Sequence, residues 1–198
     1  MKSSKKNRLN VIEQAIKDAH AYALEHCGVP LNKMPEYFLG VEIGKRMIQE
    51  FDNFSVRFEM SVKQLMAQAG IESAGDKSDR ENGRFDLVLL TKRYGKPAHV
   101  IEIKRGVKTD SMLSDIKRLA NICRYSKVGA RLETNYFVAI TRRSSTVVAE
   151  RGKVLFAKSS ETGCLDNITV DKSRVFNLDT PDGKSVTAAI YEVTYQYN

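Results

Sequence analysis

The chain has 198 residues, of which 42% are hydrophobic, enough for one domain with a sizeable core, so disordered and fibrous architectures are excluded. Lys and Arg number 32 against 24 Asp and Glu, and the net charge of +8 favours a polyanionic partner such as nucleic acid. Half of this excess lies in the first eight residues, and we expect residues 1–9 to form a basic flexible tail.

The cysteines and the N-terminal segment indicate the compartment. Three cysteines lie far apart, without a CxxC pair or a cluster of His and Cys, which argues against a disulfide framework and a structural zinc site. Charged residues interrupt the apolar run of residues 9–26, so neither a signal-peptide core nor a membrane span is predicted there. We expect a cytoplasmic protein that does not bind membranes.

Two amphipathic helices are predicted in the first quarter of the chain. Apolar residues recur at helical spacing over residues 10–26, and Gly28 provides a stop. Pro35 suits the start of a second helix, in which apolar residues recur every four positions to Phe51. On that helix Glu36 falls on the apolar face and Glu42 on the polar face, and we expect the small Gly40 to let the helix approach a sheet closely.

The rest of the chain alternates strands with helices. Residues 55–60 have the period of a half-buried strand, residues 62–69 suggest a short helix, and residues 71–83 have the composition of a mobile loop. Apolar runs at 84–90 and 98–105 flank a Gly/Pro turn and predict a β-hairpin. Another helix follows from residue 110 or 111, with Asp115, Lys117, Arg118 and Arg124 placed on its polar side.

A buried strand at 136–140 and a C-terminal part rich in strands complete the pattern. Residues 146–151 suit a helix and 154–157 an extended segment, and 175–178 with 185–195 predict a hairpin around a Pro-Asp-Gly turn. The predicted fold is one α/β domain with a mixed central β-sheet flanked by α-helices. It divides into an N-terminal helix within residues 10–34, a core over 35–143 and a C-terminal extension over 144–198.

Three charged residues stand out because they lie in strands that are otherwise apolar. Asp86 has apolar neighbours on both faces of its strand, and Glu102 and Lys104 lie among Val100, Ile101 and Ile103. Ionised groups in such strands are costly unless they are paired or bound to a metal. Since side chains alternate along strands, these three can face one side and converge across the hairpin.

Two carboxylates beside an ammonium group suggest a specific chemistry. Carboxylate oxygens suit Mg²⁺ or Mn²⁺, and a neighbouring lysine can position a water and offset charge that develops on a phosphate. The sequence therefore predicts hydrolysis of phosphodiester bonds, with Asp86, Glu102 and Lys104 as catalytic residues and the two acids as metal ligands.

The arrangement Asp-x15-Glu-x-Lys on a hairpin, followed by a helix and a strand, resembles the PD-(D/E)XK (restriction-endonuclease-like) nuclease superfamily. The matching segments are Arg84-Phe85-Asp86-Leu87-Val88 and Val100-Ile101-Glu102-Ile103-Lys104, without the proline that often precedes the aspartate. The resemblance covers roughly residues 35–143 and implies an αβββαβ core, with an extra N-terminal helix and a C-terminal β-hairpin here. It further implies the Ile103 carbonyl as a metal ligand and Glu36 as the helical acid of the site.

The same resemblance implies an endonuclease or exonuclease that needs Mg²⁺ or Mn²⁺, acts on DNA in preference to RNA, and serves host defence or mobile-element processing. The remaining basic residues of the predicted polar faces, expected to contact phosphates, are Lys108, Lys117, Arg118, Arg124, Arg142 and Arg143. A solvated surface is an equally acceptable reading of these residues. The sequence is compatible with a homodimer and with a subunit of a larger complex.

Several alternatives stay open. Glu102 and Lys104 can instead form a salt bridge on a sheet surface, with Asp86 paired to Arg84 or Arg105. Glu42 and Glu59 compete with Glu36 for the place of the third acid. His99 has the opposite strand parity from Glu102, which predicts a structural imidazole. The rival function is a catalytically inactive module on the same fold that binds nucleic acid or protein.

Overall fold

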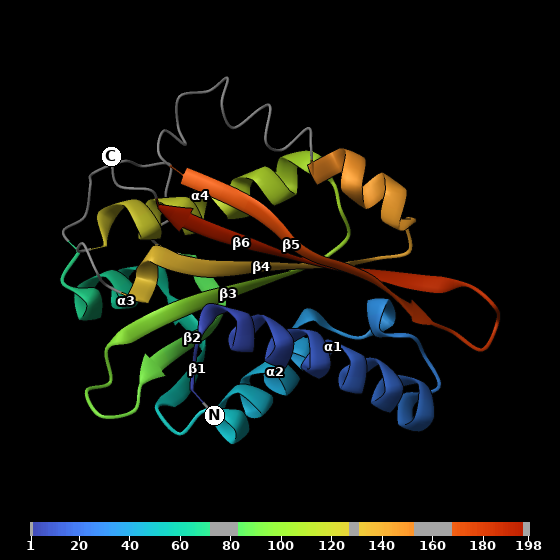
Figure 1. Cartoon of the computed structure of the whole chain (residues 1–198), viewed down its shortest axis with the longest axis horizontal. Coiled ribbons are helices and arrows are strands. Elements are labelled where there is room, and N and C mark those ends of the chain that lie inside the picture. The colour runs from blue at the N-terminus through green and yellow to red at the C-terminus, as the bar shows by residue number, and fades with distance from the viewer. Residues whose placement is uncertain (1, 72–82, 127–130, 153–167, 196–198) are drawn as a thin grey trace.

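The computed structural model describes residues 2–71, 83–126, 131–152 and 168–195. In this part of the chain, six strands form one sheet in the order β1-β2-β3-β4-β6-β5 (Figure 1). The strands are β1 (Phe54–Ser61), β2 (Arg84–Thr91), β3 (Pro97–Arg105), β4 (Thr134–Thr141), β5 (Ile168–Asp179) and β6 (Ser185–Tyr195). Only β3 and β4 run parallel, and the other neighbouring pairs are antiparallel.

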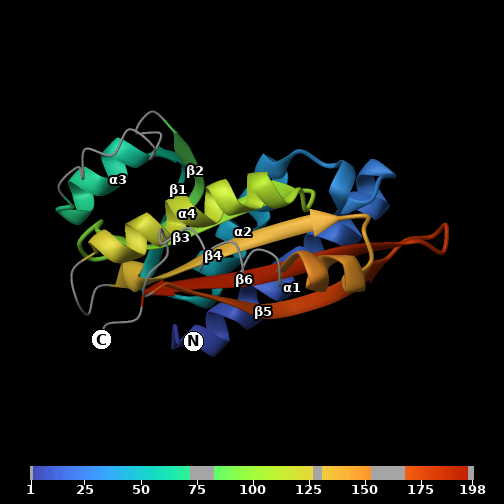
Figure 2. The ribbon, with the colours of Figure 1, turned by 90° about the horizontal axis from the view of Figure 1, so that it is seen from above.

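Helices cover both faces of this sheet. Helices α1 (Lys5–Cys27) and α2 (Glu36–Glu50) lie on one face, and α4 (Thr109–Tyr125) lies on the other (Figures 1 and 2). A short helix, α3 (Val62–Ala69), follows β1, residues 145–152 are helical, and the short 3-10 helices are η1 (Leu31–Lys33) and η3 (Arg131–Glu133). Each face has its own hydrophobic core, one with α1 and α2 and one with α3 and α4. The predicted mixed sheet flanked by helices is confirmed.

The first helix begins earlier than its apolar pattern indicated. Ser4 caps α1 because its hydroxyl accepts a hydrogen bond from the Asn7 amide at 3.2 Å. Arg8 and Leu9 are buried, and the Arg8 guanidinium donates to the Tyr136 hydroxyl on β4 at 2.8 Å. The prediction of a flexible tail as far as residue 9 is therefore wrong for residues 5–9. A basic residue reaches into the fold there.

Helix α2 approaches the sheet most closely at Gly44. A Cβ atom at that position would lie 2.9 Å from two ring carbons of Phe58, closer than side chains tolerate. A Cβ atom at Gly40 would lie 3.5 Å from Ile103 Cδ1, an ordinary contact. The close approach predicted at Gly40 is thus found one helical turn later. The glycine at 44 therefore lets α2 lie close to β1 and β2.

The C-terminal hairpin extends the sheet beyond β4. Strand β6 pairs with β4 on one side and with β5 on the other, so the predicted hairpin is confirmed and β5 begins at Ile168 rather than at 175. The predictions for residues 72–82 and 154–157 lie outside the described residues. Among the described helices, none combines the length and the apolar character that a membrane crossing requires.

Candidate functional site

Strands β2 and β3 separate where Asp86 and Glu102 face each other. The ladder pairs Leu87 with Ile101, and beyond this pair side chains take over from backbone hydrogen bonds. The Asp86 amide donates to Glu102 Oε2 at 3.1 Å, and the Ile103 amide donates to Asp86 Oδ2 at 2.6 Å. The two predicted acids therefore meet in the gap between the strands.

Glu59 on β1 lies opposite Asp86 and marks a bend in the sheet. The ladder pairs Phe58 with Leu87 and Met60 with Phe85, so Glu59 falls between these pairs. Phe58 and Leu87 pack on the α2 side, whereas Met60 and Phe85 belong to the α4 core, so both strands change face here. The φ angle of Glu59 is 50°, an uncommon conformation for a residue with a side chain. The regular alternation predicted for β2 thus breaks at Asp86.

The Asp86 carboxyl group holds its proton more tightly than an ordinary aspartate. Burial raises the pKa of Asp86 to about 6, and the charges of Glu36 and Glu59 add to this rise. The hydrogen bond from the Ile103 amide and the charge of Lys104 oppose the rise but do not cancel it. The rise comes first from burial and then from the neighbouring carboxylates, and a bound cation would oppose both by favouring the ionised form.

Glu36, the first residue of α2, reaches the far end of β3. Its Oε1 atom accepts a hydrogen bond from the Arg105 amide at 2.7 Å, so the carboxylate lies against the sheet. Glu42 points outward instead and forms an ion pair with Lys45 at 3.3 Å. The predicted phase of this helix is confirmed. Glu36 and Glu59 both remain candidates for the third acid, since the charge of each acts on Asp86.

Lys104 is held by Asp115, a residue that the sequence prediction placed on the polar side of α4. The Lys104 Nζ atom lies 3.1 Å from Asp115 Oδ2, and Asp115 is buried. Burial alone lowers the pKa of Lys104, but the hydrogen bond and charge of Asp115, with the charges of Glu36 and Asp86, outweigh it and raise the pKa. The predicted exposure of Asp115 is wrong because the residue lies three positions after Met112, on the buried stripe.

Arg118 also faces inward, contrary to prediction. Its guanidinium contacts Glu102 Oε1, lies 3.4 Å from Asp115 Oδ1 and stacks over the Phe85 ring at 5.1 Å. Only 13% of the side chain is exposed, so its placement on a phosphate-contacting outer face is wrong. Lys108, Arg124, Arg142 and Arg143 are exposed and Lys117 is half-buried. Their predicted contacts with phosphates stay a prediction.

The contacts of the three charged strand residues contradict the surface salt-bridge alternative. Glu102 is 4% exposed and is partnered by Arg118, while Lys104 is partnered by Asp115. Asp86 Oδ2 accepts a hydrogen bond from the Ile103 amide, where the alternative predicted a salt bridge to Arg84 or Arg105. His99 lies elsewhere on β3 and donates from Nδ1 to the Thr134 carbonyl at 2.7 Å, as expected for a structural imidazole.

The oxygen atoms around Asp86 are of the type that a hard divalent cation binds. Carboxylates of Asp86 and Glu102 and the carbonyl of Ile103 are oxygen ligands of the sort that Mg²⁺ binds. In the arrangement seen here, however, Glu102 Oε1 contacts Arg118 and Oε2 accepts from the Asp86 amide. Within the described ranges, no three His, Cys, Asp or Glu side chains are already grouped as metal ligands. Binding through Glu102 would therefore require Arg118 to move away.

Comparisons of this chain with protein-family models, curated proteins and solved structures found no match.

Proposed function

We propose that this protein is a metal-dependent nuclease that hydrolyses phosphodiester bonds, in DNA in preference to RNA. The observation that carries the proposal is the position of Asp86, lodged between the separated ends of β2 and β3 with Glu102 beside it. The charges of Glu36 and Lys104 act on the same carboxylate. The order α2-β1-β2-β3-α4-β4, with α3 inserted, further supports the resemblance to the PD-(D/E)XK superfamily.

In this proposal Asp86, Glu102 and the Ile103 carbonyl hold the cation. A bound Mg²⁺ or Mn²⁺ would polarise the scissile phosphate and lower the pKa of a bound water. Lys104, whose pKa is raised, stays protonated at neutral pH and donates to the attacking water or to a phosphate oxygen. Glu36, which lies against β3 at the Arg105 amide, is the carboxylate placed to accept the proton of that water.

The contact between Arg118 and Glu102 favours the second candidate function, an inactive binding module. In such a module the guanidinium permanently occupies the place of the cation, and the basic surface alone binds nucleic acid. The two functions differ in their response to divalent ions. A nuclease site is stabilised by Mn²⁺ through Asp86, whereas the module is indifferent to it.

The test is incubation of the purified chain with plasmid DNA, linear DNA and RNA in Mg²⁺ or Mn²⁺, with EDTA as the negative condition. Asp86→Asn is the inactivating variant, and Asp18→Asn is its control because Asp18 pairs with Arg46 on the outer side of the helices. We expect hydrolysis that EDTA and Asp86→Asn abolish and Asp18→Asn preserves. Absence of metal-dependent hydrolysis of every substrate would overturn the enzyme proposal, and retained DNA binding would then support the module.

A further inference from the structure

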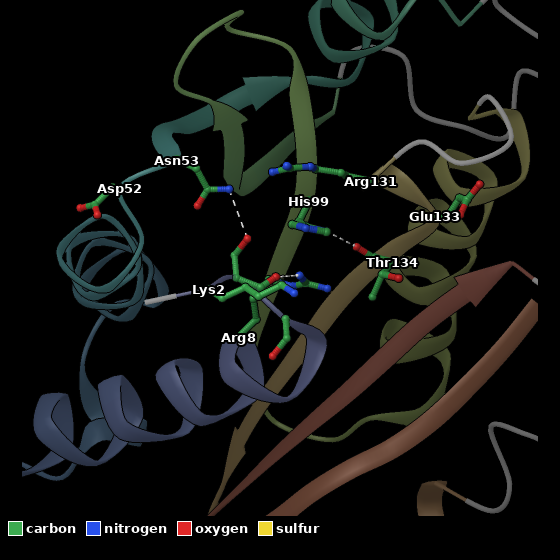
Figure 3. Close-up of a pocket in the computed structure, with 10 residues that line it drawn as sticks. Lys2, Arg8, Asp52, Asn53, His99, Arg131, Glu133 and Thr134 are labelled. Carbon is green, nitrogen blue, oxygen red and sulfur yellow. Dashed lines mark hydrogen bonds between the residues drawn. The ribbon is translucent and has the colours of Figure 1, made fainter.

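A cavity of about 650 Å³ lies near the start of β3, away from the carboxylate site (Figure 3). Four segments line it: the N-terminal segment with Lys2 and Arg8, the α2–β1 connection with Asn53, β3 with His99, and η3 with the start of β4, which supply Arg131 and Thr134. His99 precedes Lys104 by five residues on the strand, about 17 Å at the usual rise. The cavity is therefore separate from the proposed nuclease site.

His99 presents an unused hydrogen-bond acceptor here. A carbonyl can only accept, so the bond to Thr134 O assigns the proton of the neutral ring to Nδ1 and leaves a lone pair on Nε2. Burial and the charges of Arg8 and Arg131 lower the pKa of His99 to about 3 against the effect of the Thr134 bond, so the ring is neutral at pH 7. His99 is 2% exposed, and Nε2 has no hydrogen-bond partner in the described part of the chain.

An acceptor of this kind points to a donor that the described residues do not supply. Buried polar atoms are nearly always satisfied, because leaving one unpaired costs stability. Figure 3 shows the His99 ring between the side chains of Arg131 and Arg8, facing the space that they enclose. A ligand that enters this space can present an N–H or O–H group to Nε2.

Cations surround the same space. Arg8 is fixed by the Tyr136 hydroxyl at 2.8 Å and by the Ser3 carbonyl, and Arg131 stacks on the Phe54 ring at 5.7 Å. The ion pairs found among the described residues include neither arginine. Lys2 adds a third cation, and the positive end of the α1 dipole lies alongside through Ser3 and Ser4.

Two acids also line the cavity, but away from its centre. Figure 3 places Asp52 and Glu133 at opposite margins, whereas Arg8, Arg131 and His99 face one another between them. A second hollow of about 440 Å³ shares Asp52 and Arg131 and adds Lys92 and Arg93. The positive charge therefore continues from the cavity toward the β2–β3 turn.

We propose that this cavity binds a phosphate monoester, with Arg8 and Arg131 taking the phosphate and a donor of the esterified group reaching His99 Nε2. Guanidinium groups match the oxygens of a phosphate, and three cations with a helix N-terminus suit a group that carries up to two negative charges. The volume suits a ligand of nucleotide size. The phosphate can come from a free mononucleotide or from the 5′ end of a nucleic-acid strand. The proposal does not depend on nuclease activity.

The experiment is titration calorimetry of the full chain in EDTA at fixed ionic strength. The probes are adenosine 5′-monophosphate, adenosine, and an eight-nucleotide DNA strand with and without a 5′-phosphate. We expect the phosphorylated member of at least one pair to bind, and to bind more tightly than its unphosphorylated counterpart. Arg131→Gln should weaken this binding about tenfold or more, the scale of losing a charge-assisted hydrogen bond. The matched control is Arg46→Gln, because Arg46 lies on α2, pairs with Asp18 and does not line the cavity.

A second variant tests the histidine separately. His99→Phe removes the unsatisfied acceptor and also the hydrogen bond from Nδ1 to the Thr134 carbonyl, so its melting temperature is measured to show that it folds, and its affinity for the phosphorylated probe should fall. In the wild type, the ¹⁵N resonance of Nε2 should shift on binding, a signal that requires no catalytic activity. Binding of the mononucleotide identifies a free nucleotide as the source, and binding of the phosphorylated strand alone identifies a strand end.

The proposal is overturned if no phosphorylated probe binds more tightly than its unphosphorylated counterpart, or if Arg131→Gln and His99→Phe both bind as tightly as wild type. Because EDTA excludes metal-dependent hydrolysis, loss of cleavage in Asp86→Asn with binding retained leaves this inference intact. Failure of the nuclease proposal is thereby distinguished from failure of the phosphate site.

Discussion

The amine of Lys104 on β3 lies 3.1 Å from Asp115 Oδ2 on α4, so a buried carboxylate on the covering helix holds a lysine of the sheet. We predict that Asp115→Asn lowers the pKa of Lys104, because the hydrogen bond and charge of Asp115 are what outweigh the opposing effect of burial. The titration of Lys104 followed by NMR at its Nζ and Cε atoms checks this.

The stability of the protein should change with pH in a matching way. The pKa of Lys104 is raised in the folded state above its ordinary 10.5, so its contribution to stability is complete below that pH and disappears as the pH rises through the folded value. The free energy of unfolding of Asp115→Asn should therefore fall less between neutral and strongly alkaline pH than that of the wild type. Asp110→Asn, on the exposed first turn of the same helix, is the control and should leave the pKa of Lys104 unchanged. An unaltered Lys104 titration in Asp115→Asn would contradict the assignment.

Asp86→Asn should stabilise the metal-free protein while removing activity. The folded-state pKa of Asp86 is raised from 3.8 to about 6. The protonated carboxyl group therefore stabilises the folded protein fully below pH 3.8, and this stabilisation disappears as the pH rises through 6. An asparagine carries no charge and can still accept the hydrogen bond from the Ile103 amide. At pH 7 we expect a gain of ~1–3 kcal/mol in the free energy of unfolding.

The pH dependence makes this prediction specific. The gain in Asp86→Asn should shrink as the pH falls from 7 to 4.5, because the wild-type carboxyl group then becomes protonated. Urea denaturation in EDTA at several pH values measures it. A large loss of stability at pH 7 would mean that the ionised carboxylate is a structural partner in the fold, as the salt-bridge interpretation holds.

Gly44 should be the glycine of α2 that cannot be replaced. An alanine there places its Cβ 2.9 Å from the Phe58 ring, and relieving this contact must move the helix or the ring. We expect Gly44→Ala to cost ~1–3 kcal/mol. The matched variant Gly40→Ala meets only an ordinary contact at 3.5 Å and should be neutral or stabilising by up to ~1 kcal/mol, because alanine favours the helix. Thermal melting of the two variants compares them directly, and equal losses would show that the spacing between α2 and the sheet is assigned wrongly.

Local periodicity was enough to predict most elements and the central part of the candidate site. Alternation in the hairpin brought Asp86 and Glu102 together, and the helical phase placed Glu36 against the sheet and Glu42 outside. The same phase argument would have found Asp115, which lies between Met112 and Leu119 on the buried stripe of α4. Its charge suggested a solvent-facing residue. A buried acid is acceptable there because a lysine and an arginine meet it.

Other features depend on contacts between distant segments and leave no local signal. The contact of Arg8 with Tyr136 joins the N-terminal segment to β4 and draws a basic residue into the fold. The positive φ angle of Glu59 arises where β1 and β2 change face together, which neither strand shows alone. The cavity around His99 likewise combines four segments that are far apart in the chain. Sequence patterns describe one element at a time, so such junctions could not be predicted.

The last prediction separates the three acids that compete for the third place in the site. Glu36 lies against β3 through the Arg105 amide, and Glu59 lies opposite Asp86 on β1, while Glu42 pairs with Lys45 outside. A glutamine keeps the size and the acceptor of each side chain but removes the charge. We expect Glu36→Gln to lower cleavage by about 10²-fold or more, the usual scale for losing a positioned acid or base, and Glu42→Gln to be nearly neutral.

Glu59→Gln distinguishes a direct role from a purely electrostatic one. Its charge raises the pKa of Asp86, as that of Glu36 does, so both variants should lower this pKa and move the acidic limb of the pH–rate profile to lower pH. Only the variant whose carboxylate also holds the metal or the water should lose rate at the pH optimum, and we expect that variant to be Glu36→Gln. Rates measured from pH 5 to 9 in Mn²⁺ provide both readouts. If Glu36→Gln only shifts the profile while Glu59→Gln lowers its maximum, the third acid of the site belongs to β1, and the bend at Glu59 is what aims it at Asp86.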